Sequence, residues 1–382
     1  MKVDVEQAVS GSLGSSLRRL LNSIDLPETA GKRILVKPNM GRIAPPLSGI
    51  VTTKEVIMET VLFFIEQGAS EVLLGDSPIT GVSSVEAFAS AGITPRDMPP
   101  GSELIDMDSC GYTDIEVSSG KLISSLRVCT PAAEADCIVS VPVMKTHMHT
   151  VVSLGLKNMK GCLYRKEKIK FHKLDGSGLE EKALDTALAD MAGVLLPDVT
   201  IIDGTVGMEG FGPSSGETVF PGLLIGSSDC IAADAVCAKL MGFDPREVPS
   251  LRLCAERGFG MIDTDEMEII PGHYMDHAAV FTPAPCSIDV EYDGVYVYDS
   301  GACSACLSTV VLFLERYKDE LADLFDNEDI HIYIGDRNDV QAGENNILIG
   351  RCTAGDKDKG IFIQGCPPVA SAIIEQLRSQ KS

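Results

Sequence analysis

The chain has 382 residues, an apolar content of 45% and a formal net charge of −23, which comes from 55 acidic and 32 basic side chains. A chain of this length corresponds to two or three domains, and its apolar content excludes wholesale disorder. The acidity argues against DNA or RNA as the main partner, because a phosphate backbone binds a basic surface, and it disfavours an anionic membrane surface for the same reason.

Membrane insertion and export are also disfavoured. The most apolar runs, residues 61–65 and 310–314, are far shorter than the roughly 20 residues of a membrane-spanning helix. The first residues carry acids where a signal peptide would carry a basic segment followed by an apolar one. We therefore expect a cytoplasmic protein, in which the 12 cysteines are buried, catalytic or metal-binding rather than paired in disulfides.

The first three quarters of the chain alternate between strand-like and helix-like segments. The expected strands cover residues 33–37, 71–74, 137–141, 199–202 and 223–225, and the expected helices cover residues 54–67, 83–91, 181–194, 229–241 and 245–257. Asp229 is the expected N-cap of its helix. This alternation predicts an α/β fold, in which a mostly parallel sheet carries flanking helices.

The sequence Thr-Pro-Ala-Pro at residues 282–285 predicts a linker. We therefore expect a large N-terminal α/β domain at residues 1–282 and a small domain at residues 286–382. The small domain has its own pattern, with helices at residues 303–324 and 366–377 and strands at residues 331–334, 347–349 and 361–363. It is predicted to be a second α/β domain, and it contains a group of cysteines.

Four cysteines of the small domain form a candidate metal site. Cys303 and Cys306 make a C-x2-C pair, and Cys352 and Cys366 follow. Four thiolates suit a [4Fe–4S] cluster or structural zinc. Zinc ribbons usually contain two C-x2-C pairs, so the single pair favours the cluster and leaves zinc as the alternative. Cys366 lies in a Gly-Cys-Pro-Pro element that resembles ligand sites in iron–sulfur subunits of hydrogenases and respiratory complexes. It also precedes a predicted helix, whose N-terminus would stabilise a thiolate.

The other eight cysteines are isolated in apolar surroundings. A free cysteine in such a setting usually behaves as a small buried hydrophobe. We therefore expect these eight to belong to the core rather than to a metal site.

Residues 145–173 form a basic island, with eight lysines and arginines against one glutamate and thus a net charge of +7. Clustered cations attract anions, and ligands of open α/β sheets collect outside the carboxyl ends of the strands. Lys145, His147 and His149 follow a predicted strand, and Lys157, Asn158 and Lys160 follow closely. The island is therefore predicted to bind an anionic small molecule, and a solvated charged loop is the alternative.

The two histidines of the island could also serve a metal or a proton. His147 and His149 are two residues apart, so an extended segment would place both rings on one side. The sequence offers no third ligand beside them, so a metal site there is a weaker hypothesis than the anion site.

Other polar residues stand at expected strand ends. Lys37 and Asn39 follow the first strand, Asp76 follows the second, and Asp203 and Glu209 follow the strand that begins at residue 199. The acids could act in proton transfer or hold Mg²⁺, and turn formation is the alternative. Neither nucleotide-binding glycine motif, GxGxxG or GxxxxGK[ST], occurs in the required strand–turn–helix context.

Six motifs recur in a fixed order and together carry a family resemblance. They are ILVKPN at residues 34–39, GDSP at 75–78, MKTH at 144–147, LGLKNMKG at 154–161, DG at 203–204 with GMEG at 207–210, and residues 232–243. The chain resembles the family known as domain of unknown function 362 over residues 30–260. The resemblance implies a prokaryotic protein, often with an attached iron–sulfur module of the bacterial ferredoxin type. The spread cysteines depart from that type and imply one cluster. The family implies no reaction.

Three functions remain open. The favoured hypothesis is an iron–sulfur redox protein that passes electrons to or from an anionic small molecule, a cofactor or a redox protein partner at the Lys/His-rich site. If it has turnover, the corresponding enzyme class is an oxidoreductase. The second hypothesis is a non-redox enzyme or binding protein for an anion, with a structural metal module. The third is an adaptor protein without turnover, whose acidic surface attracts a basic partner.

Overall fold

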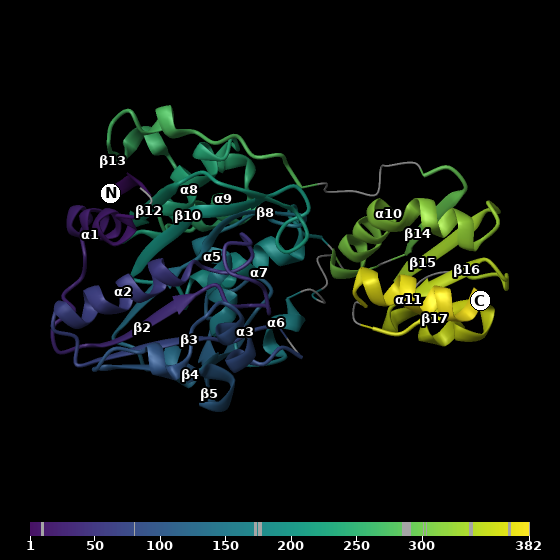
Figure 1. Cartoon of the computed structure of the whole chain (residues 1–382), viewed down its shortest axis with the longest axis horizontal. Helices are drawn as coiled ribbons and strands as arrows, with labels where there is room; N and C mark the ends of the chain where they lie inside the picture. The colour runs from purple at the N-terminus through teal and green to yellow at the C-terminus, as the bar shows by residue number, and fades with distance from the viewer. Residues whose placement is uncertain are drawn as a thin grey trace. The chain divides into compact units, whose positions relative to one another are not determined.

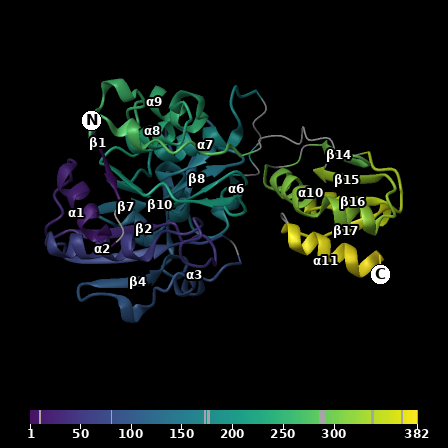
Figure 2. The ribbon, with the colours of Figure 1, turned by 45° about the horizontal axis from the view of Figure 1, so that its top comes forward.

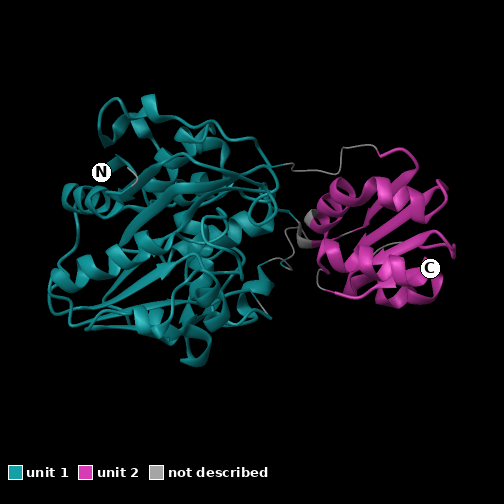
Figure 3. Ribbon diagram, viewed as in Figure 1, with its two compact units in different colours: residues 1–284 teal, residues 285–382 magenta. Residues whose placement is uncertain are grey.

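The computed structural model describes residues 1–8, 11–79, 81–171, 174, 178–284, 292–300, 302, 304–335, 339–365 and 368–381. The chain divides into two compact units, Met1–Ala284 and Pro285–Ser382 (Figure 3). The division falls within the Thr-Pro-Ala-Pro segment that the sequence marks as a linker. Among the described residues, no helix is both long and apolar enough to cross a membrane.

The large unit is built on one sheet, whose strands follow the order β13-β1-β12-β10-β7-β2-β3-β4, with β8, β9 and β11 joined to it through β10 and β8. Their bounds are β1 Lys2–Gln7, β2 Arg33–Pro38, β3 Glu71–Asp76, β4 Ser102–Asp106, β7 Cys137–Val141, β8 Val143–His147, β9 Val151–Ser153, β10 Val199–Glu209, β11 Glu217–Val219, β12 Leu223–Ser227 and β13 Glu268–Ile270. Strands β7, β2, β3 and β4 are parallel neighbours, and β10 is parallel to β7 and antiparallel to β12. A separate antiparallel pair joins β5 Tyr112–Glu116 to β6 Ser125–Cys129.

Helices cover both faces of this sheet (Figures 1 and 2). One face packs on α1 Leu13–Ser23, α2 Lys54–Glu66 and α3 Ser84–Ser90, and the other packs on α5 Gly155–Asn158, α7 Ala183–Ala192, α8 Cys230–Leu240 and α9 Pro249–Glu256. The short helices α4 Thr130–Ala133 and α6 Glu167–Lys170 complete the unit. Successive side chains of a strand point to opposite faces, and accordingly Ile34 and Val36 join one core while Leu35 joins the other. The predicted α/β fold is confirmed.

The small unit has a parallel sheet in the order β14-β15-β16-β17, formed by β14 Val295–Ser300, β15 Ile330–Gly335, β16 Asn346–Ile349 and β17 Ile361–Ile363. Its long helix α10 Ser304–Leu324 and its last helix α11 Ala370–Lys381 share one core with the isoleucines of these strands. An ion pair of 2.6 Å between Arg378 and Glu320 joins the two helices. The carboxyl ends of the four strands therefore lie along one edge of a small, separately packed sheet.

Three segments differ from the sequence expectation. The segment from Asp203 to Glu209, which the sequence places after the strand that begins at residue 199, is a continuation of that strand as β10, because β8 and β11 pair with it and satisfy its backbone. Residues 143–147 form strand β8 rather than a loop. Helix α11 begins at Ala370, four residues later than expected.

The N-cap of α8 gives a test of the packing on its face of the sheet. Asp229 accepts hydrogen bonds from the backbone N–H groups of Ile231 (2.9 Å), Ala232 (3.0 Å) and Met261 (2.9 Å). The change Asp229→Ala should lower the free energy of unfolding by about 1–2 kcal/mol, the usual value of a buried N-cap, when measured by urea denaturation. The control is Asp244→Ala, since Asp244 caps only a single exposed turn. Equal losses in the two variants would contradict this role of Asp229.

Candidate functional site

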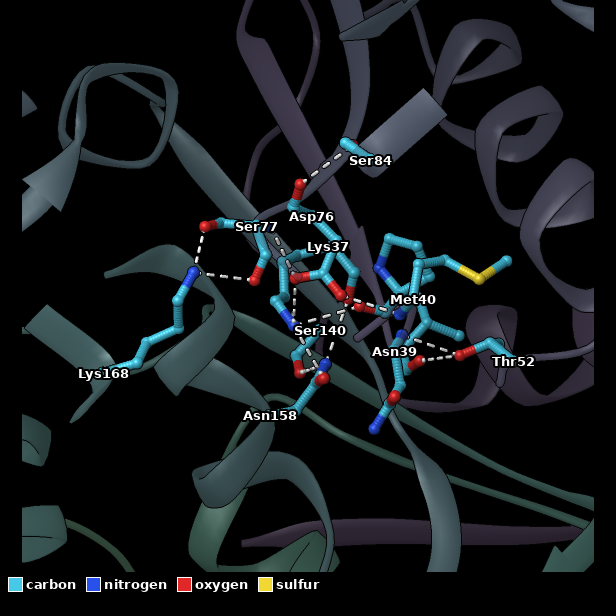
Figure 4. A network of polar contacts seen from close by, with 12 residues as sticks. Lys37, Asn39, Met40, Thr52, Asp76, Ser77, Ser84, Ser140, Asn158 and Lys168 are labelled. Carbon is cyan, nitrogen blue, oxygen red and sulfur yellow. Dashed lines mark hydrogen bonds and ion pairs between the residues drawn. The ribbon is translucent and has the colours of Figure 1, made fainter. Parts of the chain in front are cut away.

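A buried polar network joins the carboxyl ends of β2, β3 and β7 (Figure 4). The Lys37 ammonium is 2% exposed and lies 2.9 Å from Asp76 Oδ1. It also donates to Asn158 Oδ1 at 2.7 Å and to the Pro38 carbonyl at 3.0 Å. The Asn158 amide donates in turn to the Lys37 carbonyl at 3.1 Å and to Ser140 Oγ at 3.0 Å. A lysine ammonium has three donors, so Lys37 uses its full hydrogen-bonding capacity within the protein.

The carboxylate of Asp76 has further partners. Its Oδ2 accepts from the Met40 N–H at 2.7 Å, and its Oδ1 accepts from the Ser77 N–H at 2.9 Å. The segment after α5 packs directly on the ion pair, because a Cβ at Gly161 would lie 2.2 Å from Asp76 Oδ1 and 2.4 Å from Lys37 Nζ. Three of the predicted binding residues, Lys37, Asp76 and Asn158, are therefore bonded to one another, and they hold the strand ends in place.

Lys145 lies near this network, within β8, and is 2% exposed. Its ammonium donates to the Ile50 carbonyl at 2.8 Å. Burial, together with the positive charges of Arg42, Lys157 and Lys37, lowers the pKa of Lys145 to about 7. Lys145 is therefore a buried cation that other cations surround.

Two more lysines extend this cluster from α5 and the turn after it. Burial lowers the pKa of Lys157 to about 8, and Asp185 partly offsets this effect. Lys160 is 8% exposed, and its ammonium lies 5.1 Å from the centre of the Phe171 ring. Its pKa is also lowered by burial and then by Lys157 and Lys168. We call Lys145, Lys157 and Lys160 the lysine cluster.

The two histidines lie beside the lysine cluster. His147 ends β8 and is 6% exposed, and its Nδ1 accepts a hydrogen bond of 3.0 Å from the His149 N–H. The two ring centres are 5.5 Å apart. Burial lowers the pKa of His149 to about 3, with further contributions from Lys157, Lys182 and Lys160. His149 is therefore a neutral imidazole. Within the described part of the chain, no three His, Cys, Asp or Glu side chains are grouped as metal ligands.

The rest of the basic island divides between surface and interior. Arg165 and Lys166 are exposed, and Lys170 pairs with Glu167 at 2.6 Å. The ammonium of Lys168 donates to the Ser77 carbonyl at 2.9 Å. The alternative of a solvated charged segment therefore fits residues 165, 166 and 170, but it does not fit the lysine cluster. Lys173 lies outside the described residues.

The remaining sequence candidates have structural partners of their own. Asp203 is fully buried and accepts from the Thr53 N–H at 2.7 Å and the Thr205 N–H at 3.0 Å, which fixes the start of α2. Glu209 accepts from the Thr282 N–H at 2.8 Å. Asn39 bonds through its backbone, and Figure 4 shows its amide directed away from Lys37. These three residues are not part of the lysine cluster.

Sequence reasoning missed Asp185, Lys182 and Arg42. Asp185 lies in the first turn of α7, is 0% exposed, and acts electrostatically on Lys157. One signal was present in the sequence, because an acid among the apolar residues of a helix is unusual. Arg42 had no such signal, since it lies in the loop between β2 and α2 and only the fold brings it near Lys145.

Two of the four predicted metal ligands, Cys303 and Cys366, lie outside the described residues. Cys306 is 4% exposed in the first turn of α10, and Cys352 is exposed after β16. Along the sequence, Cys303, Cys352 and Cys366 each come three residues after the end of a strand, β14, β16 and β17. These strands are parallel members of one sheet, so their carboxyl ends lie at one edge.

The remaining cysteines behave as the sequence predicted, with one exception. Six are buried, and these are Cys129, Cys137, Cys162, Cys230, Cys237 and Cys254. The prediction was wrong for Cys110, which is exposed, because it lies in a turn between β4 and β5 rather than in the core. Cys286 lies outside the described residues.

Parts of the chain are similar to known proteins. The family model described as domain of unknown function (DUF362) matches residues 34–239, more than half of the chain. A thylakoid-associated protein of Synechocystis sp. is 28% identical over 245 residues, which cover 63% of this chain and 74% of that protein.

Two solved structures share part of the fold. The lactate racemase apoprotein from Thermoanaerobacterium thermosaccharolyticum matches with a TM-score of 0.40 and 16% identity, over 63% of this chain and 56% of that chain. A protein from Thermotoga maritima matches with a TM-score of 0.36 and 12% identity, over 65% of this chain and 60% of that chain. The match thus spans less than two thirds of either solved chain.

The contrast between Lys37 and Lys145 gives a test. Lys37→Met would leave Asp76 buried without its cation, so we expect a loss of about 3–5 kcal/mol in unfolding free energy. Lys145 behaves differently, because its pKa is lowered from 10.5 to about 7. Between these pH values the unfolded chain holds that proton and the folded protein does not, so the charged form destabilises the fold. Lys145→Met should therefore be at least as stable as the wild type at pH 6, by urea denaturation. A large loss in the Lys145 variant would refute this distinction.

Proposed function

The chain belongs to the DUF362 family, and we propose that it is a redox protein that binds an anionic small molecule at the lysine cluster and exchanges electrons through an iron–sulfur cluster of its small unit. The observation that carries the proposal is the proximity of the buried Lys145 and the half-buried Lys157, with depressed pKa values of about 7 and about 8. Within the described part of the chain, neither ammonium has a carboxylate at ion-pair distance, whereas Lys37 has Asp76.

Burying uncompensated cations is unfavourable, and proteins usually pair them. An anion at the lysine cluster would remove this penalty, because it would return the two ammonium groups to their charged form. Lys145 uses one of its three donors on the Ile50 carbonyl, which leaves two for a ligand. The nearby imidazole of His149 is neutral, so it does not repel the ammonium groups that would bind the anion. The site therefore suits a carboxylate, a phosphate or a sulfate.

The residues of the small unit also fit the proposed cluster. Four thiolates are the donor set of a [4Fe–4S] cluster, and zinc remains the alternative occupant. Gly350 follows β16 with a φ of 97°, and a Cβ there would lie 3.2 Å from Cys306 Sγ. The absence of a side chain at this position leaves room for an inorganic core beside the thiol. Such a cluster supplies reversible one-electron transfer when bound.

A non-redox function is the second candidate, and one specific observation favours it. The lysine cluster lies wholly within Met1–Ala284, whereas the four cysteines lie within Pro285–Ser382. Under this alternative the large unit binds its anion by itself and the metal has only a structural role. The two candidates differ in whether ligand binding depends on the oxidation state of the metal site.

Anion binding should depend on pH in a defined direction. The free protein holds Lys145 and Lys157 with pKa values of about 7 and about 8. Below these pH values both amines are already protonated and can bind an anion directly. Above them, the protein must take up protons when it binds the anion. With sulfate, whose charge is constant in this range, the dissociation constant should rise at least about tenfold from pH 6 to pH 9. Isothermal titration calorimetry measures this rise.

The control for this titration is Lys170→Met, because Lys170 lies in the same basic island but on the surface. It should bind sulfate as the wild type does, whereas Lys145→Met and Lys157→Met should each bind at least about tenfold more weakly. Sulfate binding that is independent of pH and of both cluster lysines would reject the proposed site.

Metal content tests the small unit. Protein purified without oxygen should contain about four irons and four sulfides per chain and show a broad absorbance band near about 400 nm. Replacement of Cys303, Cys306, Cys352 or Cys366 by serine should reduce the iron content severalfold, since each change removes a thiolate ligand. Iron and sulfide assays with EPR measure the result.

The matched control is Cys110→Ser, since Cys110 is exposed as Cys352 is but is not one of the four proposed ligands. It should keep its iron. One zinc per chain without iron would exclude the redox proposal and favour the non-redox candidate. Redox titration in the presence of sulfate then shows whether the two sites are coupled.

A further inference from the structure

Asp185 differs from the other buried aspartates of the large unit in that both of its carboxylate oxygens lack a hydrogen-bond partner among the described residues; in Asp4 only Oδ1 does. Asp76, Asp203 and Asp234 each accept at least two backbone hydrogen bonds. Asp190, five residues further along α7, accepts from three backbone N–H groups and from the Arg257 guanidinium. Asp185 is 0% exposed, and neither of its carboxylate oxygens has a hydrogen-bond partner among the described residues.

An unsatisfied carboxyl group in the interior costs free energy and requires an explanation. Burial raises the pKa of Asp185 to about 7, so the group is a carboxylic acid in about half of the molecules at neutral pH. In that form it can both donate and accept a hydrogen bond. The fold therefore retains a buried donor and acceptor that it does not use itself.

The surroundings of Asp185 place it at the lysine cluster. Helix α7, which carries Asp185, packs against α5, which carries Lys157 (Figure 1). Lys182 and Lys157 partly offset the rise that burial causes in the pKa of Asp185, and the same two lysines add to the lowering that burial causes in the pKa of His149. Asp185 and His149 therefore both lie within electrostatic reach of Lys157, which belongs to the lysine cluster where the proposed function places the anion.

We propose that Asp185 is a specificity-determining residue of the lysine cluster, and that the ligand is an organic anion which carries a hydroxyl or amino group next to its charged group. The anionic group binds the lysines, and the neighbouring hydroxyl or amine forms hydrogen bonds with Asp185. This inference rests on the proposed anion site, but it does not depend on the iron–sulfur cluster.

The test compares two probes that differ by one hydroxyl, acetate and glycolate, on the full chain by isothermal titration calorimetry at pH 6. A site that hydrogen-bonds a ligand hydroxyl discriminates strongly against the analogue without it. The wild type should bind glycolate at least about tenfold more tightly than acetate. Asp185→Ala should bind both probes with affinities within about twofold of each other and should keep the wild-type affinity for acetate. Asp185→Asn, which retains a donor and an acceptor, should keep much of the preference.

A stability measurement separates this role from a structural one. Asp185→Ala removes an unsatisfied group and should melt at or above the wild-type temperature. Asp190→Ala, on the same helix and equally buried, should melt several degrees lower, because the change leaves three N–H groups and a guanidinium without their hydrogen-bond acceptor. A melting temperature of Asp185→Ala as low as that of Asp190→Ala would overturn the inference.

The outcomes distinguish the two proposals. If the wild type prefers glycolate and Asp185→Ala has the same preference, the role of Asp185 is wrong while the lysine site stands. If the wild type binds both probes equally, the ligand class is wrong. If neither probe binds, or if Lys157→Met binds both as the wild type does, the anion site itself is wrong and this inference is lost with it.

Discussion

The ion pair between Lys37 and Asp76 is the interaction on which the architecture of the site depends. It lies at the carboxyl ends of two parallel strands, where the chain leaves the sheet and backbone groups need new partners. Asn158 adds the third element, since it links α5 to the same ammonium. Each charge in this group is matched by an opposite charge or a hydrogen bond, so the pair can remain buried. The contact is so close that only glycine fits at residue 161. The position of α5, and with it of Lys157, follows from this packing.

The electrostatics of the lysine cluster differ from those of this ion pair. Lys145 and Lys157 are held by the scaffold that Lys37 stabilises, but among the described residues neither forms an ion pair as Lys37 does with Asp76. A folded protein tolerates such unfavourable groups where function requires them, and it offsets them elsewhere. Asp185 is a second group of this kind, with the opposite charge when ionised and no hydrogen-bond partner among the described residues. The two kinds of unsatisfied group lie together, and a single ligand with an anionic group and a neighbouring donor would satisfy both.

In the small unit, the proposed cysteine ligands also follow the ends of parallel strands along the sequence. Cysteines far apart in the sequence follow the ends of β14, β16 and β17, which are members of one sheet. Ligands of parallel sheets collect at the carboxyl ends of the strands, and here that edge would supply thiolates. The spacing of these cysteines is irregular in the sequence because strands and helices of different lengths separate them.

The sequence by itself determined the α/β class, the alternation of strands and helices, the N-cap at Asp229 and the family to which the chain belongs, because these depend on local periodicity and on short motifs. It also marked Lys37, Asp76 and Asn158 as candidate ligand-binding residues, since each occurs in a motif of the family. Only the tertiary structure decided which charged residues are satisfied. Lys37 and Lys145 look equivalent in the sequence, yet within the part of the chain that the structure describes Lys37 pairs with Asp76, whereas Lys145 has only the Ile50 carbonyl. Asp203 and Asp185 are both buried, yet only Asp203 has hydrogen-bond partners among the described residues. The reason is physical. Burial and pairing depend on which segments, distant in the sequence, the sheet brings together, and the identity of a residue does not reveal which of them will lie beside it.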